Sequence, residues 1–283
     1  EEFFVPDPAG GVLYNFDGKG RHIRTLDTML GTLLYSFEYD AFGRLAGITD
    51  FNGNRTSIER DGRGVGRAII GPYGHRTELS VRGGDLAELI DPNGATFGMT
   101  YEKGLMKTFT DAEGDVTEFG YDGNGYLTKE EDSAGGSTTL SRWQDSGRCI
   151  VTSTSGLGET QTYDVNRLEN GVIETRNTEP GGGSMDAVVD SSGLTSITYP
   201  DGSTVSQRTK PDPRFGAGVP ILDTETLTTP GGIAVTTSLS RSTELENSAD
   251  MLSLLTQSDT LSTNGIRAEE HTSELQSRFG NSY

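Results

Sequence analysis

A glycine that returns at nearly constant intervals constrains the fold of this chain more than any other feature. Successive glycines of the series are separated by 22, 21, 20, 20 and 21 residues. The series consists of Gly31, Gly53, Gly74, Gly94, Gly114 and Gly135. Four of these glycines close an Asp-x-x-Gly string, and looser versions of the string continue to Gly202. A register kept over so many intervals predicts a tandem array in which each unit packs on its neighbours.

A second turn lies between successive members of this series. Its clearest copy is Tyr39-Asp40-Ala41-Phe42-Gly43-Arg44-Leu45, and further copies begin at Tyr101 and Tyr121. Aspartate at the start of such a turn accepts hydrogen bonds from the backbone two residues on. Glycine at the fourth position takes the positive φ that a type I turn followed by a bulge requires. The residues that carry the repeat motif are Tyr39, Asp40, Gly43, Arg44, Leu45, Asp50, Gly53, Asp91, Gly94, Tyr101, Gly104, Asp111, Gly114, Tyr121, Asp122, Gly125, Leu127, Asp132 and Gly135.

Between the turns, aromatic and polar residues alternate. Tyr35, Phe37 and Tyr39 occupy alternate positions of one segment, and Phe97, Met99 and Tyr101 do the same in another. A period of two predicts strands with one apolar face and one wet face. Aromatic residues at equivalent places in successive repeats are expected to form ladders across neighbouring strands. With 32% hydrophobic residues, the chain suits a thin sheet, so we expect an all-β fold of tandem β-hairpins.

The pattern weakens toward the end of the chain. We expect a repeat array over residues 1–209, with its best copies over 14–135, and an irregular Thr/Ser-rich β continuation over 210–268. Gly181–Gly183 is expected to be a loop. The prolines of Pro211-Asp212-Pro213 and Pro220 predict a rigid connector. Strands are expected at 224–229 and 233–239, and Ser242–Leu255 is either a short helix or, as we favour, a further strand.

The last residues, 269–283, depart from every preceding pattern. Their codons can be written as a common short-read sequencing adapter, so we expect this segment to be a translated adapter; a polar, disordered tail is the alternative. The chain also opens in mid-repeat without methionine. We therefore expect a metagenomic fragment whose cut edges favour aggregation or marginal stability.

Composition argues against several classes of function. Nucleic-acid binding needs a basic surface, which a chain with a net charge of −19 does not offer. No apolar run is long enough for membrane insertion. Cys149 is a lone cysteine, and His22 and His75 lie in different repeats. The carboxylates of Asp111, Glu113 and Asp115 alternate faintly as in a calcium loop, but the turn lacks the length and the closing glutamate of such a loop, so we interpret them as turn caps. Nucleophile and phosphate-binding motifs are also missing. We therefore expect no enzyme, no catalytic residue, no cofactor and no metal.

The unit Tyr39–Leu45, followed by Asp50–Gly53, resembles the YD repeat of RHS proteins. The resemblance is firm over residues 14–135 and weaker over 136–209. It implies a ribbon of hairpins that spirals into a β-sheet shell. In bacterial members the shell encloses a C-terminal toxin domain, and the animal relatives are adhesion proteins. Asp91-Pro92-Asn93-Gly94 is similar to the autoproteolytic string of toxin shells, but Asp111–Gly114 lacks the matching proline, so we interpret both as turns.

The resemblance implies a function and a place for the protein. We expect a structural shell segment whose partner is an enclosed toxin or effector domain of the same polypeptide, secreted or at the cell surface of a bacterium. The alternative is a surface adhesion module that holds carbohydrate through exposed tyrosines and Trp143.

Overall fold

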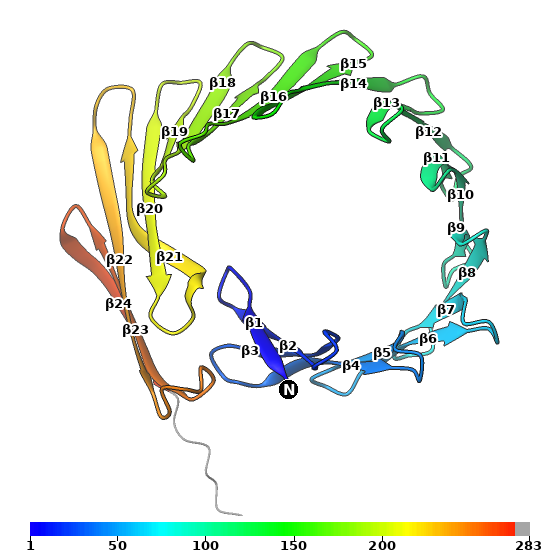
Figure 1. Ribbon diagram of the computed structural model, residues 1–283, viewed down its shortest axis with the longest axis horizontal. Helices are drawn as coiled ribbons and strands as arrows, with labels where there is room; N and C mark the ends of the chain where they lie inside the picture. Colours follow the sequence, from blue (N-terminus) through cyan, green and yellow to red (C-terminus); the bar gives the residue numbers. More distant parts are fainter. Residues whose placement is uncertain (275–283) are drawn as a thin grey trace, which may run out of the picture. The chain divides into compact units, whose positions relative to one another are not determined.

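The computed structural model describes residues 1–274, with side chains through Arg267. This part of the chain contains 24 strands and no helix (Figure 1). The first twelve strands are β1 (Phe3–Pro6), β2 (Val12–Phe16), β3 (His22–Asp27), β4 (Leu33–Tyr39), β5 (Leu45–Asp50), β6 (Arg55–Arg60), β7 (Gly66–Ile70), β8 (Arg76–Arg82), β9 (Asp85–Ile90), β10 (Thr96–Glu102), β11 (Leu105–Thr110) and β12 (Val116–Tyr121). The others are β13 (Leu127–Glu131), β14 (Ser137–Gln144), β15 (Arg148–Ser155), β16 (Thr160–Arg167), β17 (Ile173–Thr178), β18 (Ser184–Val189), β19 (Thr195–Thr198), β20 (Thr204–Asp212), β21 (Gly216–Thr228), β22 (Ala234–Leu245), β23 (Leu254–Thr263) and β24 (Ile266–Glu274).

The strands form an antiparallel meander, in which a strand pairs with the one that follows it in sequence. Leu79 of β8 lies opposite Leu89 of β9, and Leu89 lies opposite Phe97 of β10. Met99 of β10 lies opposite Phe109 of β11. Side chains that oppose each other share a face of the sheet, so the alternation of the sequence becomes one continuous apolar row. The all-β repeat fold expected from the sequence is confirmed.

The chain divides into two compact units. Unit 1 contains residues 1–36 and 166–176 and all of the described chain from Ser184 onward, and unit 2 contains residues 37–165 and 177–183. These boundaries differ from the expected division at residue 209, which concerns repeat quality and stays a prediction. No membrane-spanning helix occurs among residues 1–274.

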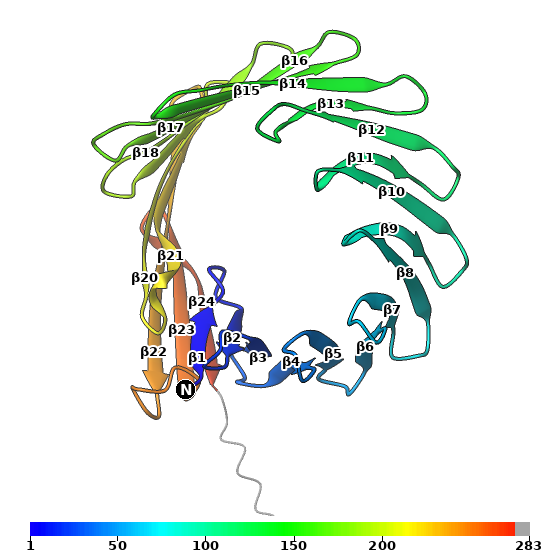
Figure 2. The ribbon, with the colours of Figure 1, turned by 45° about the vertical axis from the view of Figure 1, so that its right-hand side comes forward.

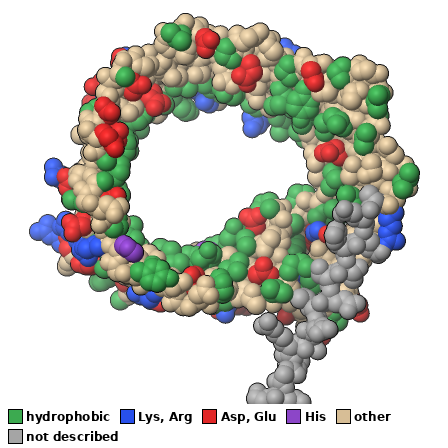
Figure 3. All heavy atoms as spheres, turned by 180° about the vertical axis from the view of Figure 1, so that it is seen from behind, with side chains coloured by type: hydrophobic (Ala, Val, Ile, Leu, Met, Phe, Trp, Pro, Cys, Tyr) green, Lys and Arg blue, Asp and Glu red, His purple; other side chains and the backbone are tan. Residues whose placement is uncertain are grey.

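Unit 2 is a single curved layer of hairpins (Figure 2). On the left of Figure 3, where β7–β12 lie, hydrophobic side chains gather along the inner side of the arc and charged side chains along its outer side. Ala68 is the buried apolar residue of this unit among the described residues. Phe97, Met99 and Phe109 are only half-buried, because a single layer shields its side chains laterally and not from above.

Unit 1 holds the buried core. Leu13, Leu26, Val219, Ile221 and Leu254 are at most 9% exposed. They come from β2, β3, β21 and β23, so the first strands of the chain pack against strands that follow about two hundred residues later. A Cβ atom added at Gly10 would lie 3.0 Å from a methyl carbon of Val219. The repeat pattern gives no sign of this contact.

The C-terminal strands confirm some expectations and correct others. The strands expected at 224–229 and 233–239 are confirmed as parts of β21 and β22, except that β21 ends at Thr228 and β22 begins at Ala234. Strand is correct only for the two ends of Ser242–Leu255, which contain the end of β22 and the start of β23; residues 246–253 between them form a turn, and the helical alternative is wrong. The expected connector around Pro211 and Pro220 is instead a hairpin, in which these prolines oppose each other. Proline is tolerated there because the strand pairing is interrupted by a bulge.

Two further observations concern loops and the tail. The expected loop Gly181–Gly183 is a regular turn closed by Gly182, whose φ is 82°. The backbone of residues 269–274 continues β24, which pairs with β23. Residues 275–283 lie outside the described residues. A backbone conformation does not show which DNA encodes a segment, so the interpretation of residues 269–283 as a translated adapter stays a prediction.

Candidate functional surface

The motif residues build one recurring turn. At Asp40, the backbone N–H donates to the Arg44 carbonyl at 2.9 Å, and the Gly43 N–H donates to the Asp40 carbonyl at 2.9 Å. Gly43 has a φ of 78°. Asp40 Oδ1 accepts the N–H groups of Phe42 and Arg44, both at 2.9 Å. This is the geometry of a type I turn closed by a glycine bulge, and it is the reason for aspartate at the first position and glycine at the fourth.

The same two hydrogen bonds to Oδ1 recur through the array. Asp50 accepts the N–H groups of Asn52 and Asn54 at 2.9 and 2.8 Å. Equivalent pairs form at Asp91, Asp111, Asp122 and Asp132. Gly53, Gly94, Gly114, Gly125 and Gly135 all have positive φ. The structure therefore places the motif aspartates and glycines together, turn by turn, in a structural role.

Electrostatics favour the ionised aspartates. Asp40 Oδ2 accepts a hydrogen bond from Arg44 Nε at 2.8 Å, and Asp17 Oδ2 accepts one from Arg21 Nε at 2.8 Å. The backbone N–H of Arg21, followed by its side chain, lowers the pKa of Asp17 to about 2. The backbone N–H of Arg44 likewise lowers the pKa of Asp40. Hydrogen bonds to the charged form explain these shifts, which need no catalytic role.

The turn that follows Tyr101 differs from the expected copy. Glu102 lies opposite Leu105, so only Lys103 and Gly104 form the loop. Their φ angles are 54° and 79°. Positive φ at both loop positions defines a type I′ turn without the third loop residue of the YD turn. Several turns lie outside the predicted repeat pattern, among them those at Asp61–Gly64 and at Gly83-Gly84. Their glycines are the sequence signal that could have found them.

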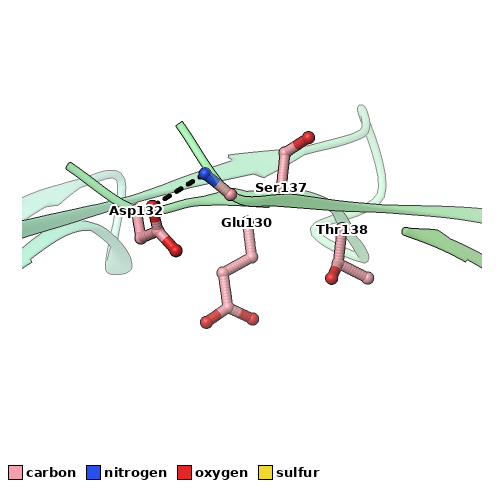
Figure 4. Close-up of a pocket in the computed structure, with 5 residues that line it drawn as sticks. Glu130, Asp132, Ser137 and Thr138 are labelled. Atoms are coloured by element: carbon pink, nitrogen blue, oxygen red, sulfur yellow. Dashed lines mark hydrogen bonds between the residues drawn. The ribbon is translucent and has the colours of Figure 1, made fainter. Parts of the chain in front are cut away.

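The apolar row changes character at β13. Phe119 of β12 lies opposite Glu130, and Glu130 lies opposite Thr138. Glu130 and Thr138 belong to a shallow hollow of about 250 Å³, which Asp132, Gly136 and Ser137 also line. Figure 4 shows Glu130 and Thr138 on one side of the sheet and Ser137 on the other. Asp132 already accepts the Gly136 N–H at 2.8 Å, so the hollow has the features of a turn and not of a ligand site.

Potential metal ligands are dispersed. No group of three His, Cys, Asp or Glu in the described part of the chain could hold a metal ion. Asp111 Oδ1 accepts the N–H groups of Glu113 and Asp115, and Asp115 Oδ1 accepts the Ser133 hydroxyl at 2.8 Å. His22 Nε2 lies 2.9 Å from the Arg24 carbonyl oxygen. These carboxylates and this imidazole therefore serve local backbone structure.

One cluster of side chains does not follow from the sequence pattern. Asp212, Arg214 and Arg241 meet beside the buried core of unit 1, where Asp212 is 3% exposed. Arg214 reaches the Thr28 carbonyl, 186 residues earlier in the chain. The one sequence signal is the Pro-Asp-Pro-Arg string, which by itself is typical of a connector.

Comparison with known proteins places this architecture in a family. The sequence profile of the Teneurin YD-shell family matches residues 1–278. The chain belongs to the teneurin YD-shell family. Its repeats are therefore YD repeats, and its role is structural, as part of the wall of a YD shell.

The curated relatives are much longer than this chain. Teneurin-1 of Gallus gallus is 32% identical over 127 residues, which cover 44% of this chain and 5% of the relative. Teneurin-3 of Danio rerio is 26% identical over 232 residues, which cover 81% of this chain and 8% of the relative. The chain thus corresponds to a small part of these proteins.

Solved structures give weaker likenesses. TcdB2-TccC3 without its hypervariable C-terminal region has a TM-score of 0.36 at 10% identity, and the match covers 93% of this chain and 18% of that one. The Tc holotoxin pore of Photorhabdus luminescens has a TM-score of 0.38 at 11% identity, with the same coverage. Scores this low do not bear on function.

Proposed function

We propose that this segment belongs to a shell that encloses a toxin or effector domain of the same polypeptide. The observation that supports the proposal is the apolar row of unit 2, exemplified by Leu89, Phe97 and Phe109. These side chains are half-exposed, and hydrophobic side chains gather along the inner side of the arc where β7–β12 lie (Figure 3). A large apolar face on a rigid layer is suited to contact with another polypeptide.

The enclosed domain would lie outside the 283 residues of this chain. Membership of a family whose curated relatives are many times longer supports this arrangement. We further propose that the protein is secreted or displayed at a bacterial cell surface, and that it acts without a cofactor, catalytic residue, nucleic acid or membrane insertion. The carboxylates used as turn caps and the net charge of −19 support these last points.

Protease protection of the full-length gene product tests the proposal. An enclosed domain should resist a protease that digests the same domain expressed alone. Variants that open the wall should restore digestion. A gene that encodes no domain after the repeats, or a downstream domain digested equally fast in both contexts, would contradict enclosure.

An adhesion module is the second candidate function. It is favoured by aromatic side chains that face solvent, since Tyr73 is 78% exposed and Trp143 is 52% exposed. Flat aromatic surfaces of this kind can stack on sugars. Binding of the chain to a glycan array, lost in Trp143→Ala and retained in Leu157→Ala, would support adhesion; an array without signal would exclude carbohydrate as the partner.

The nucleotide sequence tests the proposed origin of residues 269–283. Codons identical to the adapter would support a translated adapter. The same protein sequence from adapter-free genomic DNA would refute it and would extend the β continuation proposed for 210–268.

A further inference from the structure

A single arginine connects three distant parts of unit 1. Arg214 lies in the turn between β20 and β21, and its Nη2 donates to the Thr28 carbonyl at 2.5 Å. Its Nε donates to the Met251 carbonyl. Thr28 follows β3, whereas Met251 precedes β23. The planar guanidinium can satisfy both carbonyls at once because its donors point in fixed, different directions.

The arginine is itself held in place by a buried carboxylate. Asp212 Oδ1 accepts the N–H groups of Arg214 and Phe215 at 2.7 and 2.9 Å. Asp212 Oδ2 accepts Arg241 Nη1 at 2.9 Å. Arg241 also donates twice to Asp259, at 2.7 Å in each case. The tip of the β20–β21 hairpin is thereby fixed to β22 and β23 before it reaches the N-terminal strands.

The polar contacts lie next to the apolar core. Val219 and Ile221 follow the turn on β21 and are 2% and 8% exposed. Leu13 and Leu26 oppose each other on β2 and β3 and complete the buried set on the other side. Thr28 is anchored in turn by its hydroxyl, which donates to the Gly10 carbonyl at 2.6 Å. Two sets of strands distant in sequence therefore meet at this place.

We propose that residues 212–216 form a clasp that holds β1–β3 against β21 and β23, and whose release opens the wall there without unfolding the repeats of unit 2. The repeats of unit 2 contact their sequence neighbours, so loss of a distant contact does not propagate through them. The core of unit 1, in contrast, is assembled from separate segments that only tertiary contacts hold together. This inference rests on the structural role of the chain as part of a shell wall, and it does not depend on the proposal that the shell encloses another domain.

Hydrogen exchange of the 283-residue chain tests the clasp. Arg214→Ala should speed amide exchange in β2 and β3 by at least about tenfold and leave β8–β12 within about twofold of the wild type. Arg63→Ala is the matched control, because it removes an equal charge from an exposed turn of unit 2. The control should leave exchange in β2 and β3 unchanged.

A conservative variant separates bridging from charge. Arg214→Lys keeps the positive charge but offers one donor group, which cannot reach both carbonyls with the guanidinium geometry. It should therefore also speed exchange selectively in β2 and β3, and it carries the test if Arg214→Ala does not fold. The clasp would be refuted by unchanged exchange in β2 and β3 in the lysine variant, or by equal acceleration in β8–β12.

Discussion

At the scale of single residues, the aspartate carboxylates of the turns act as acceptors for backbone N–H groups. Asp17 shows the strongest consequence, since its pKa falls from 3.8 to about 2 through hydrogen bonds from Arg21 and Lys19. The Asp17 carboxylate therefore takes up its proton at a higher pH in the unfolded chain than in the folded chain. Between these two pKa values, the free energy of unfolding rises with pH. The stabilisation is complete above about pH 4 and is lost as the pH falls to about 2.

This linkage predicts a pH-dependent effect of Asp17→Asn. The variant should unfold at a lower urea concentration than the wild type at neutral pH, because it loses the charged acceptor. The difference in midpoint should shrink as the pH is lowered from about 4 to about 2. Urea titrations followed by circular dichroism measure both midpoints. A difference that stays constant across this range would contradict the assignment.

Lys103 carries a different kind of residue-scale cost. Its φ of 54° lies in the left-handed region, which costs an ordinary side chain about 1–2 kcal/mol. Asparagine tolerates this region better, so Lys103→Asn should raise the free energy of unfolding by about 0.5 kcal/mol. Chemical denaturation measures the change.

Lys19→Asn provides the matched control. Lys19 occupies the third position of the turn closed by Gly20, and it is not among the residues with positive φ. The substitution should therefore change stability by less than about 0.5 kcal/mol. An equal gain in both variants would show that the backbone conformation of Lys103 is not the cause.

These residues also show what the sequence could predict. The turns at Asp40 and Asp91 were predictable because aspartate and glycine perform chemistry that few other residues can perform there. The conformation of the turn at Lys103 was not predictable, since lysine carries no signal for positive φ. The repeat pattern predicts the same type of turn there as in the other repeats. The missing signal concerns turn type, while the position of the turn was correct.

At the scale of elements, each hairpin is joined to the next by pairs that repeat with the sequence. Arg55 contacts Glu38 at 2.8 Å, and Arg76 contacts Glu59 at 2.5 Å, in both cases 17 residues earlier. Such exposed ion pairs help to set the register of neighbouring hairpins but contribute little to the free energy of unfolding. The buried core of unit 1 works differently, because its strands are not sequence neighbours.

Leu13→Ala tests where apolar burial stabilises the protein. Leu13 is fully buried on β2, and truncation of such a leucine costs about 2–5 kcal/mol. Leu157, which is 91% exposed in a turn, is the matched control, and Leu157→Ala should cost less than about 0.5 kcal/mol. Equal losses in urea denaturation would contradict the placement of the core.

The contrast between Leu13 and Phe97 explains the limits of sequence reasoning at this scale. The alternation around Phe97 predicts its strand and its face, because both depend on local periodicity. Leu13 belongs to an ordinary strand in the sequence, and it is buried in unit 1, where the nearby Gly10 lies against Val219, about two hundred residues away. Periodicity therefore predicted the ladder but assigned the core to aromatic residues that are only half-buried.

At the scale of the whole molecule, a ribbon of hairpins has two terminal strands as well as two faces. β1 pairs with β2 along one side, and its other side has no strand partner among the described residues. Phe3, Phe4 and Val5 of β1 are 48%, 40% and 43% exposed. An exposed strand edge with apolar side chains is a site of intermolecular pairing, which the net charge of −19 opposes only in part.

Val5→Lys should therefore reduce association of the chain with itself. A lysine on an edge strand opposes strand addition, because a second strand would have to bring its own side chains against an unpaired charge. Light scattering over a concentration series should show less increase in apparent mass for the variant than for the wild type. Ile233→Lys is the matched control, since Ile233 is a β-branched residue of similar hydrophobicity, 69% exposed, that lies in a turn. If both lysines reduce association equally, net charge is the cause, and β1 is not the edge through which copies pair.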